Sequence, residues 1–383
     1  MSDSRVVSWL LASDEPAARW IARTALLDSP PTARDVEAEH RAVLADPATQ
    51  ALLDRLPDWE VAADFSGHQS PAFVPNLLSL LADMGVGAGD DERVERVLDA
   101  MLRHQLPDGR FTSFARGRAA PTPAWGSLLC DTHAITEVLL RFGRGGDPRV
   151  TRALQTTVDD LASTAQGTAW PCRPDDVRGF RGPGRKGDVC PQATLEALRA
   201  WSAVPEDRRP SDLHPAARVM LHVWRRRADE QPYMFGHGYR FKVVKWPTTW
   251  YDVHGVLDAL GRFPALWRGP AAEPADRRSM AELVACLVAY NLAPDGTVTP
   301  QSCYRGFEEY SFGQKKHPSP FAAARLHQVL RRFGDLDGDV REVDVTALGS
   351  SKGGTGSPRP PKVPVARAVV QVVDAGGESV GST

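Results

Sequence analysis

The sequence predicts an all-α fold in which about five to six helical hairpins form a ring around a central cavity. Strand signals are nearly absent before residue 340, and apolar residues recur at helical spacing instead. The apolar stripes return about every 57 to 70 residues, and each is followed by a Gly or Pro turn and a second helix. Repeats of this kind cannot bury both faces alone, so they must pack against their neighbours.

The first helix of each hairpin carries an apolar stripe on one face. In the stretch 133–142, Ile135, Val138 and Phe142 follow the i, i+3, i+7 pattern of such a face. We expect these first helices to form one concentric layer that lines the cavity. They are residues 76–85, 133–142, 194–201, 256–263 and 321–334.

The second helices complete the hairpins, and two of them begin with the same short pattern, Asp-x-Arg-Val, at Asp91 and Asp147. We expect these helices at 93–105, 149–165, 215–228 and 277–291, and an N-terminal pair of helices near 15–55 as a cap or sixth unit. Residues 1–340 would then form one domain. Residues 341–383 read as a Gly/Ser/Pro-rich tail that is expected to be disordered.

The composition excludes several classes of function. The chain has 383 residues and a formal net charge of −2, which gives no argument for nucleic-acid binding. No stretch approaches the roughly 20 apolar residues of a transmembrane span, and the first residues do not resemble a signal peptide. Five scattered cysteines argue against a disulfide framework. We therefore expect a cytoplasmic protein with reduced thiols.

Three helix-like stretches begin with Asp-x-[His/Cys], and they carry the candidate chemistry. Each Asp is a favoured N-cap residue, so the pattern is explained in one reading by helix capping alone. In the other reading the helices of a ring open on one mouth, where these side chains meet. The candidate catalytic residues are then Asp131, His133, Asp188, Cys190, Asp252 and His254.

Asp, Cys and His are also residue types that bind zinc. Because neighbouring helices lie about 10 Å apart, side chains from adjacent repeats can meet on one ion. The most feasible metal set combines Asp188 and Cys190 with His254 of the next repeat. The cofactor is otherwise unknown.

The turn "QLPDGRF" contains Gln105, Gly109 and Phe111, and it resembles the repeat signature of the α/α-toroid superfamily of terpene cyclases and protein prenyltransferases. That signature is Gln, three residues, Gly, one residue and Trp, and here Phe111 replaces the Trp. The resemblance covers roughly residues 15–335. It implies an α/α toroid that acts on or binds an isoprenoid.

A second similarity is to the β subunits of protein prenyltransferases, in which a Gly-Phe loop with basic residues precedes Asp-x-Cys. Here Gly179-Phe180 precedes Arg185-Lys186 and Asp188-Val189-Cys190. The resemblance implies that Asp188 and Cys190 bind zinc and that Arg185 or Lys186 faces a prenyl diphosphate. The family's zinc-binding His after Tyr is replaced by Asp252 after Tyr251. The Asp-x-Asp-Asp and Asp-Asp-x-x-Asp motifs of terpene cyclases do not occur.

The stretch 237–252 is the densest aromatic and basic segment of the chain. It reads either as a loop over the cavity mouth, with lysines for an anion and aromatic rings for an apolar tail, or as a long loop anchored by its aromatic residues. The candidate ligand-binding residues are Arg185, Lys186, Lys242, Lys245, Trp246, Trp250 and Tyr251.

Two functions follow, and the sequence leaves both open. The first is an isoprenoid-toroid enzyme with an apolar, diphosphate-bearing ligand in its cavity. The second is a non-catalytic toroid that binds a peptide, lipid or protein partner, since fold does not decide function. Stoichiometric zinc in the purified protein would favour the enzyme. The sequence does not indicate whether a partner subunit exists.

Overall fold

The computed structural model is mostly helical, with 55% helix and 7% strand, as expected for an all-α protein. It describes residues 4–61, 63–64, 70–116, 122–180, 182, 185–230, 235, 238–249 and 251–348. One continuous cluster of buried apolar residues includes Val6 near the beginning and Leu348 at the end of this part. In the described part, no helix is long and apolar enough to cross a membrane.

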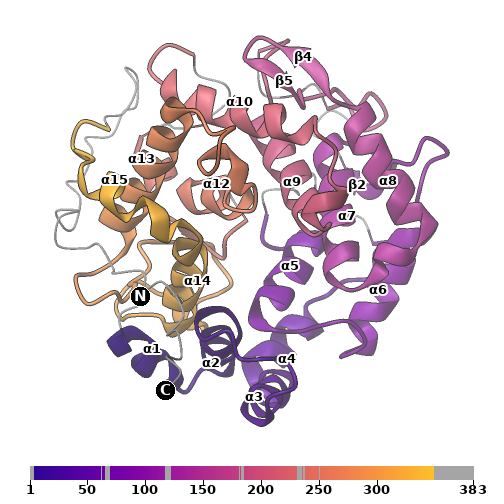
Figure 1. Ribbon diagram of the computed structural model, residues 1–383. Coiled ribbons are helices and arrows are strands. Elements are labelled where there is room, and N and C mark those ends of the chain that lie inside the picture. Colours follow the sequence, from indigo (N-terminus) through magenta and orange to yellow (C-terminus); the bar gives the residue numbers. More distant parts are fainter. Residues whose placement is uncertain are drawn as a thin grey trace, which may run out of the picture.

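Six helices surround the centre of the view in Figure 1, and each contacts the next. The last, α14, contacts α2, so the contacts close a cycle. We call these six the inner helices. They are α2 (Pro16–Ile21), α5 (Val74–Met84), α7 (Leu129–Arg141), α9 (Pro191–Ser202), α12 (Val253–Leu260) and α14 (Pro320–Leu330). The five predicted apolar stripes therefore all form helices of one layer.

A second set of helices lies farther from the centre of Figure 1. It comprises α6 (Glu92–Arg103), α8 (Pro148–Asp159), α10 (Leu213–Arg225) and α13 (Pro274–Asn291). Asp91 and Asp147, with which two of these helices begin, are N-caps: Asp91 accepts from the backbone N–H of Arg93, and Asp147 from that of Arg149. Helices α8, α10 and α13 each pack against the inner helix that precedes them.

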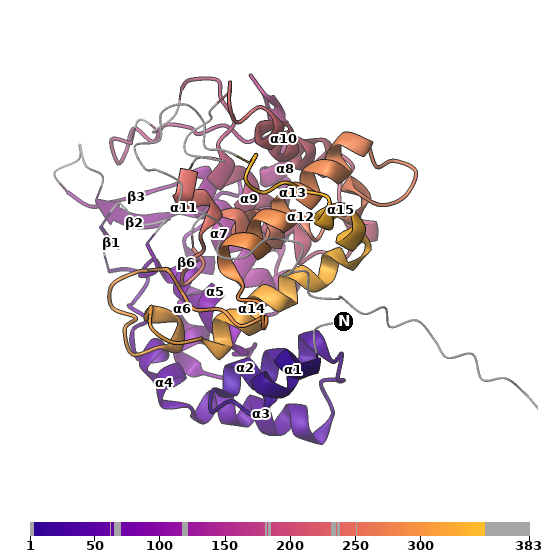
Figure 2. The ribbon, with the colours of Figure 1, turned by 90° about the vertical axis from the view of Figure 1, so that its left-hand side faces the viewer.

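The N-terminal region consists of α1 (Ser4–Leu11), α2, the π-helix η1 (Ala22–Leu26), α3 (Arg34–Ala45) and α4 (Pro47–Asp54). It lies beside α14, as Figure 2 also shows. Gly85 ends α5 with φ of 111°, and a Cβ atom at this position would be 2.8 Å from the ring of Trp20. The contact explains why a residue without a side chain connects α5 to the next turn.

Short strands occupy the connections between hairpins, in segments that show almost no strand pattern in the sequence. They form a sheet of β1 (Ala63–Asp64), β2 (Ser113–Arg116) and β3 (Ala124–Gly126), and the pairs β4 (Ala162–Thr164) with β5 (Gly167–Ala169) and β6 (Lys245–Trp246) with β7 (Ser302–Cys303). The prediction of one helix over 149–165 is wrong at its end. Helix α8 stops at Asp159, because the turn at Gly167, with φ of 131°, folds the chain into the β4–β5 hairpin.

The remaining elements are α11 (Gly238–Lys242), α15 (Asp337–Arg341) and the 3-10 helices η3 (Arg144–Gly146), η4 (Glu206–Arg208), η5 (Pro264–Leu266), η6 (Ser311–Gly313) and η7 (Arg331–Leu336). The described residues continue a short way past position 341, where the tail is predicted to begin. Val345 and Leu348 are each only 5% exposed and belong to the core cluster. The prediction of disorder for the later residues falls outside the described part of the chain.

Candidate functional site

Charged side chains from five of the inner helices and the residues that follow them form two groups of ion pairs, which together we call the inner charge cluster. Its members come from α5, α7, α9, α12, the turn after α12, α14 and the adjoining η7. They are Asp83, Glu137, Arg141, Arg199, Asp258, Arg262, Arg325 and Arg332. None of them was singled out from the sequence.

Asp83 is the hub of one half of this cluster. Its Oδ1 lies 2.7 Å from Arg141 Nη2, and its Oδ2 lies 2.9 Å from Arg325 Nη2. Glu137 Oε1 lies 3.2 Å from Arg199 Nη2 and 3.7 Å from Arg141 Nη1. Burial disfavours the ionised form of Asp83, but Arg325 and Arg141 outweigh it and lower the pKa of this carboxyl.

Asp258 is the hub of the other half. Its Oδ1 lies 2.9 Å from Arg332 Nη1 and 3.3 Å from Arg262 Nη2. Burial again opposes ionisation, yet the neighbouring guanidinium groups hold the pKa of Asp258 well below its usual value. This carboxyl is therefore ionised at neutral pH and joins α12 to η7.

The inner charge cluster contains five arginines but only three carboxylates, so it carries a surplus of positive charge. The side chains of Arg199 and Arg262 are 20% and 37% exposed, and the cluster is thus open to solvent. Arg325 is 5% exposed, and its buried Nε–H has no hydrogen-bond partner among the described residues. A buried donor and an excess of guanidinium groups suit an anionic ligand, because Arg binds phosphate and carboxylate oxygens with paired donors.

Glu196 of α9 is a buried acid of the inner helices that does not belong to the inner charge cluster. It is 4% exposed, and Gln192 Nε2 donates a hydrogen bond to its Oε1, while Oε2 has no partner among the described residues. Burial raises the pKa of Glu196 well above its usual value. It is therefore a neutral carboxylic acid with a proton to donate.

His254 of α12 lies 1% exposed, with its ring centroid 6.1 Å from that of Trp246. Neither ring nitrogen has a hydrogen-bond partner within the described residues. Burial, reinforced by Arg325, lowers the pKa of His254 to about 3. The imidazole is neutral and keeps both nitrogens available for a ligand.

Asp131 does not occupy the predicted N-cap position but lies in the first turn of α7, whose N-cap is Leu128. Its Oδ2 accepts from Ser113 Oγ at 2.8 Å and lies 3.0 Å from Arg178 Nη1. Arg178 is 1% exposed and also pairs with Asp175 at 2.5 Å. Asp131 thus anchors the loop before α9 to α7.

His133, two residues further into α7, is fully buried. Its Nδ1 lies 2.9 Å from the carbonyl oxygen of Ala193, and its ring packs edge-on against Trp170 with centroids 5.8 Å apart. Burial lowers the pKa of His133 to about 4. The contact with α9 gives this imidazole a packing role between two inner helices.

Asp188 also departs from the capping prediction, because Cys190 is the N-cap residue of α9. Asp188 pairs instead with Arg185, at 2.8 Å between Oδ2 and Nε. Within the described residues, no group of three or more His, Cys, Asp or Glu side chains could hold a metal ion. The predicted zinc set of Asp188, Cys190 and His254 is therefore not brought together.

Cys190 stands at the N-terminus of α9, a position that favours a thiolate. The neighbouring thiol of Cys172 and burial nevertheless raise the pKa of Cys190 well above its usual value. The helix N-terminus does not outweigh these two effects.

Asp252 is the one Asp of the three that caps as predicted. Its Oδ1 accepts from the backbone N–H groups of His254 and Gly255 at 3.0 and 3.1 Å, and its Oδ2 accepts from that of Lys245 at 3.0 Å. The side chain is fully buried, and burial raises the pKa of Asp252 to about 7. It therefore titrates near neutral pH.

The predicted basic and aromatic ligand-binding residues do not form one surface. Trp246 and Tyr251 are 1% and 2% exposed and belong to the apolar core. Lys242 is buried with Nζ 3.4 Å from Tyr290 Oη, and Lys245 Nζ lies 3.6 Å from the ring centroid of Tyr304. Arg185 and Lys186 are exposed. Trp250 lies outside the described residues.

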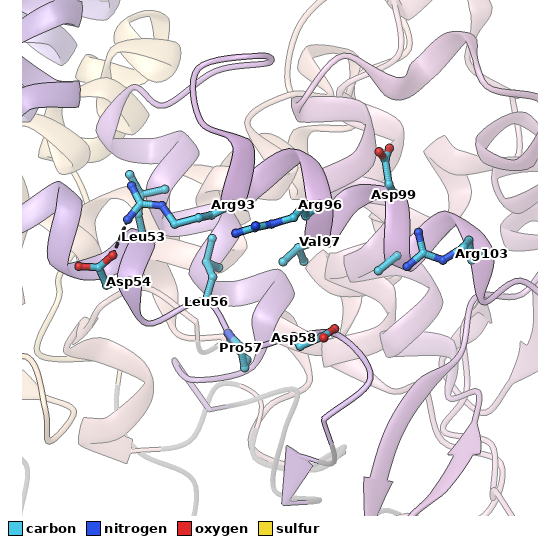
Figure 3. Close-up of a pocket in the computed structure, with 11 residues that line it drawn as sticks. Leu53, Asp54, Leu56, Pro57, Asp58, Arg93, Arg96, Val97, Asp99 and Arg103 are labelled. Carbon is cyan, nitrogen blue, oxygen red and sulfur yellow. Dashed lines mark hydrogen bonds and ion pairs between the residues drawn. The ribbon is translucent and has the colours of Figure 1, made fainter.

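The structure also has pockets that the sequence did not indicate. One, of about 510 Å³, lies between α4 and α6 and is shown in Figure 3, where Arg93 lies beside Leu53, and Arg96 and Arg103 follow along α6. Its cations are partly neutralised, since Arg93 pairs with Asp54. None of the candidate residues from the sequence lines this pocket.

Another pocket, of about 630 Å³, lies near the N-terminal end of α7. Trp125 forms part of its wall and stacks on His104 with ring centroids 3.7 Å apart. Leu106 and Val177, which are 40% and 63% exposed, also line it. The combination of aromatic rings with exposed apolar side chains suits a partner contact.

Three of the inner helices carry a further acid after the Asp-x-[His/Cys] stretch. Glu137, Glu196 and Asp258 stand six, eight and six residues after Asp131, Asp188 and Asp252, respectively. The Asp-x-[His/Cys] pattern marks the helix beginnings, while these acids lie further along the same helices. Comparison with known proteins adds nothing to this assignment, because no family model, curated protein or solved structure matches the chain.

Proposed function

We propose that the protein is an α/α toroid that binds a small anionic ligand between its inner helices. The observation that carries the proposal is the surplus of arginine in the inner charge cluster, where five guanidinium groups accompany three carboxylates. An isoprenoid diphosphate is the ligand class that the resemblance of the repeat signature to terpene cyclases and prenyltransferases suggests.

The closed cycle of helix contacts supports the toroid. A helical hairpin whose first helix contacts the first helices of both neighbouring hairpins is the unit from which such a ring is built. The turn that carries the resemblance supports it as well. Gln105 Nε2 donates to the carbonyl oxygens of Gly109 and Arg149, at 2.9 and 2.7 Å, and so connects one hairpin to the next.

The proposed anion site lies elsewhere on the inner helices than the predicted mouth. Glu137 and Arg141 stand in the second half of α7, whereas Asp131 stands in its first turn. Arg199 is our choice for the head group, since its partner Glu137 is also paired with Arg141 and can release Arg199 to a ligand. A diphosphate would add charge-assisted hydrogen bonds to this guanidinium.

Two versions of this function differ in whether chemistry follows binding. In an enzyme, Glu196 is the candidate proton donor, because it is buried, protonated and has one oxygen without a partner among the described residues. In a non-catalytic protein the same cluster binds the ligand while a partner docks on the surface. The exposed Leu106 and Val177 beside the 630 Å³ pocket favour such a partner.

The test compares three probes: inorganic diphosphate, farnesyl diphosphate and farnesol. We expect both diphosphates to raise the melting temperature, and farnesol alone to have little effect. Arg199→Gln should weaken diphosphate binding by about tenfold, which corresponds to about 1.4 kcal/mol. The matched control is Arg185→Gln, which removes an exposed arginine of the predicted mouth. Loss of binding in the control alone, or no binding of either diphosphate to the wild type, would refute the proposal.

The choice between enzyme and binding protein needs a second readout. The wild type and Glu196→Gln are incubated with farnesyl diphosphate, and released diphosphate and new hydrocarbon products are measured. An enzyme that uses this proton forms products only in the wild type, while the variant still binds. A protein that binds farnesyl diphosphate without consuming it belongs to the non-catalytic version.

A further inference from the structure

We propose that Cys172 and Cys190 are a modification site, at which a low-molecular-weight disulfide such as oxidised glutathione converts the two thiols into an internal disulfide. The proposal does not depend on the anion site. It rests on the placement of two cysteines as close neighbours on paired backbone segments and on their partial exposure to solvent.

The backbone brings these cysteines together. Pro171 and Val189 form an antiparallel bridge, and the N–H of Cys190 donates to the carbonyl oxygen of Trp170 at 2.8 Å. Cys172 and Cys190 are therefore diagonal neighbours across this bridge, on one side of the paired segments. The influence of the Cys172 thiol on the pKa of Cys190, which it raises, agrees with this proximity.

Both cysteines are partly exposed, so a small oxidant can reach them. The loop between them returns to cover Cys172, since a Cβ atom at Gly182 would lie 3.2 Å from its Sγ. In contrast, Cys286 is fully buried in α13. Cys130 is also buried; its pKa is raised mainly by burial, and Cys190 contributes to that shift. It is the only other thiol that competes for this site among those the structure describes.

The reaction proceeds by two thiol–disulfide exchanges. The thiolate of Cys172 attacks one sulfur of oxidised glutathione, the glutathione disulfide bond breaks, and one glutathione leaves as a thiolate that takes up a proton. Cys190 then loses its proton to solvent and attacks the Cys172 sulfur, which releases the second glutathione. The two protein thiols are oxidised, and one glutathione disulfide is reduced to two glutathione thiols.

The new bond would tie the loop after β5 to the beginning of inner helix α9. The loop carries Arg178, which pairs with Asp131 of α7, so oxidation would hold the same loop to two neighbouring inner helices. It also supplies Arg173 and Val177 to the 630 Å³ pocket. The site therefore links the redox state of the protein to the rigidity of that pocket's wall.

The experiment uses the full chain, incubated with oxidised glutathione and then alkylated and digested for mass spectrometry. We expect a peptide pair linked through Cys172 and Cys190, reversal by dithiothreitol, and a melting temperature raised by about 4 °C, as a closed loop of this length implies. Cys130→Ser and Cys286→Ser should behave like the wild type. Cys172→Ser should give no linked pair and no shift.

Three outcomes would overturn the proposal. The first is a link between Cys130 and Cys190 in place of the expected pair. The second is stable addition of glutathione to Cys172 without closure of the ring. The third is a wild type that remains fully reduced at a glutathione ratio that oxidises a control dithiol. Since Cys172 is partly exposed, its replacement by Ser should leave the fold intact, which circular dichroism of the variant would verify.

Discussion

Arg325 of α14 and Asp83 of α5 form a buried ion pair, with 2.9 Å between Nη2 and Oδ2. Their side chains are 5% and 8% exposed. The same carboxylate accepts a hydrogen bond from Arg141 of α7 at 2.7 Å. One acid therefore connects α5 with both α7 and α14, and its ion pairs contribute to the stability of the inner helices.

Asp83→Ala should destabilise the protein strongly. Removal of the carboxylate leaves Arg325 and Arg141 as buried charges without this partner, and broken buried pairs cost about 3–5 kcal/mol. Urea unfolding measures the free energy directly. The matched control is Asp54→Ala, which breaks a pair with Arg93 whose Asp side chain is 72% exposed and which should cost about 0–1 kcal/mol. Similar losses of unfolding free energy in the two variants would contradict the role of Asp83 in joining the inner helices.

Asp252 should make stability fall as the pH rises. Its pKa in the folded protein is about 7, against an ordinary value of 3.8, so the folded state holds a proton that the unfolded state has released. The contribution is fully present below about 3.8 and is lost as the pH rises through 7. Asp252→Asn keeps an oxygen for the capping bonds and removes the titration.

The measurement is the difference in unfolding free energy between pH 5 and pH 8. We expect the wild type to lose more stability than Asp252→Asn over this interval. Other groups titrate alike in both proteins, so their effects cancel in the comparison. Parallel pH profiles for the two proteins would show that Asp252 does not hold its proton in the fold.

His254 should have the opposite effect, at acid pH. Its folded pKa of about 3 lies below the ordinary 6.5, so the stability it contributes is present above 6.5 and is lost as the pH falls toward 3. His254→Gln should therefore lose less stability than the wild type between pH 6.5 and pH 4. His317→Gln, at an exposed position, is the control and should follow the wild type. Equal acid sensitivity in all three would show that His254 is not buried as a neutral group.

The helical layers could be predicted because their signal is local. The stripes that became α5, α7, α9, α12 and α14 repeat at helical spacing, and burial of the apolar face is what forms such helices. The strands could not be predicted in this way. Pairs such as Lys245 with Ser302 join segments far apart in the chain, and each strand is too short to show alternation.

The candidate site was predicted less well, because the Asp-x-[His/Cys] stretches are explained equally by helix capping and by a functional site. Asp252 caps, Asp131 pairs with Arg178, and Asp188 pairs with Arg185. Which partner an Asp finds depends on loops that fold back from other repeats. The inner charge cluster was missed for a related reason: arginines at helix ends read as solvated residues until neighbouring helices bring acids such as Asp258 to them.

Gly109 should be one of the least replaceable residues of the turn that carries the family resemblance. Its φ is 95°, a region that other residues rarely adopt, and a Cβ atom would lie 2.4 Å from Thr156 Oγ1 and 2.8 Å from Arg152 Cγ. Gly109→Ala therefore adds a steric clash with α8 to the backbone strain. We expect a loss of about 2–4 kcal/mol in unfolding free energy, since strain alone costs about 1–3 kcal/mol.

The control for this prediction is Gly89→Ala. Gly89 has a similar φ of 78°, but a Cβ atom there would have no neighbour within 4 Å, so only the strain remains. The difference between the two variants in urea unfolding measures the close approach of the turn to α8. Gln105→Ala should also lower the free energy of unfolding, because it removes the hydrogen bonds to Gly109 and Arg149 that hold the turn in place. If Gly109→Ala costs no more than Gly89→Ala, the turn does not pack on α8 as described, and its resemblance to a toroid repeat loses its structural basis.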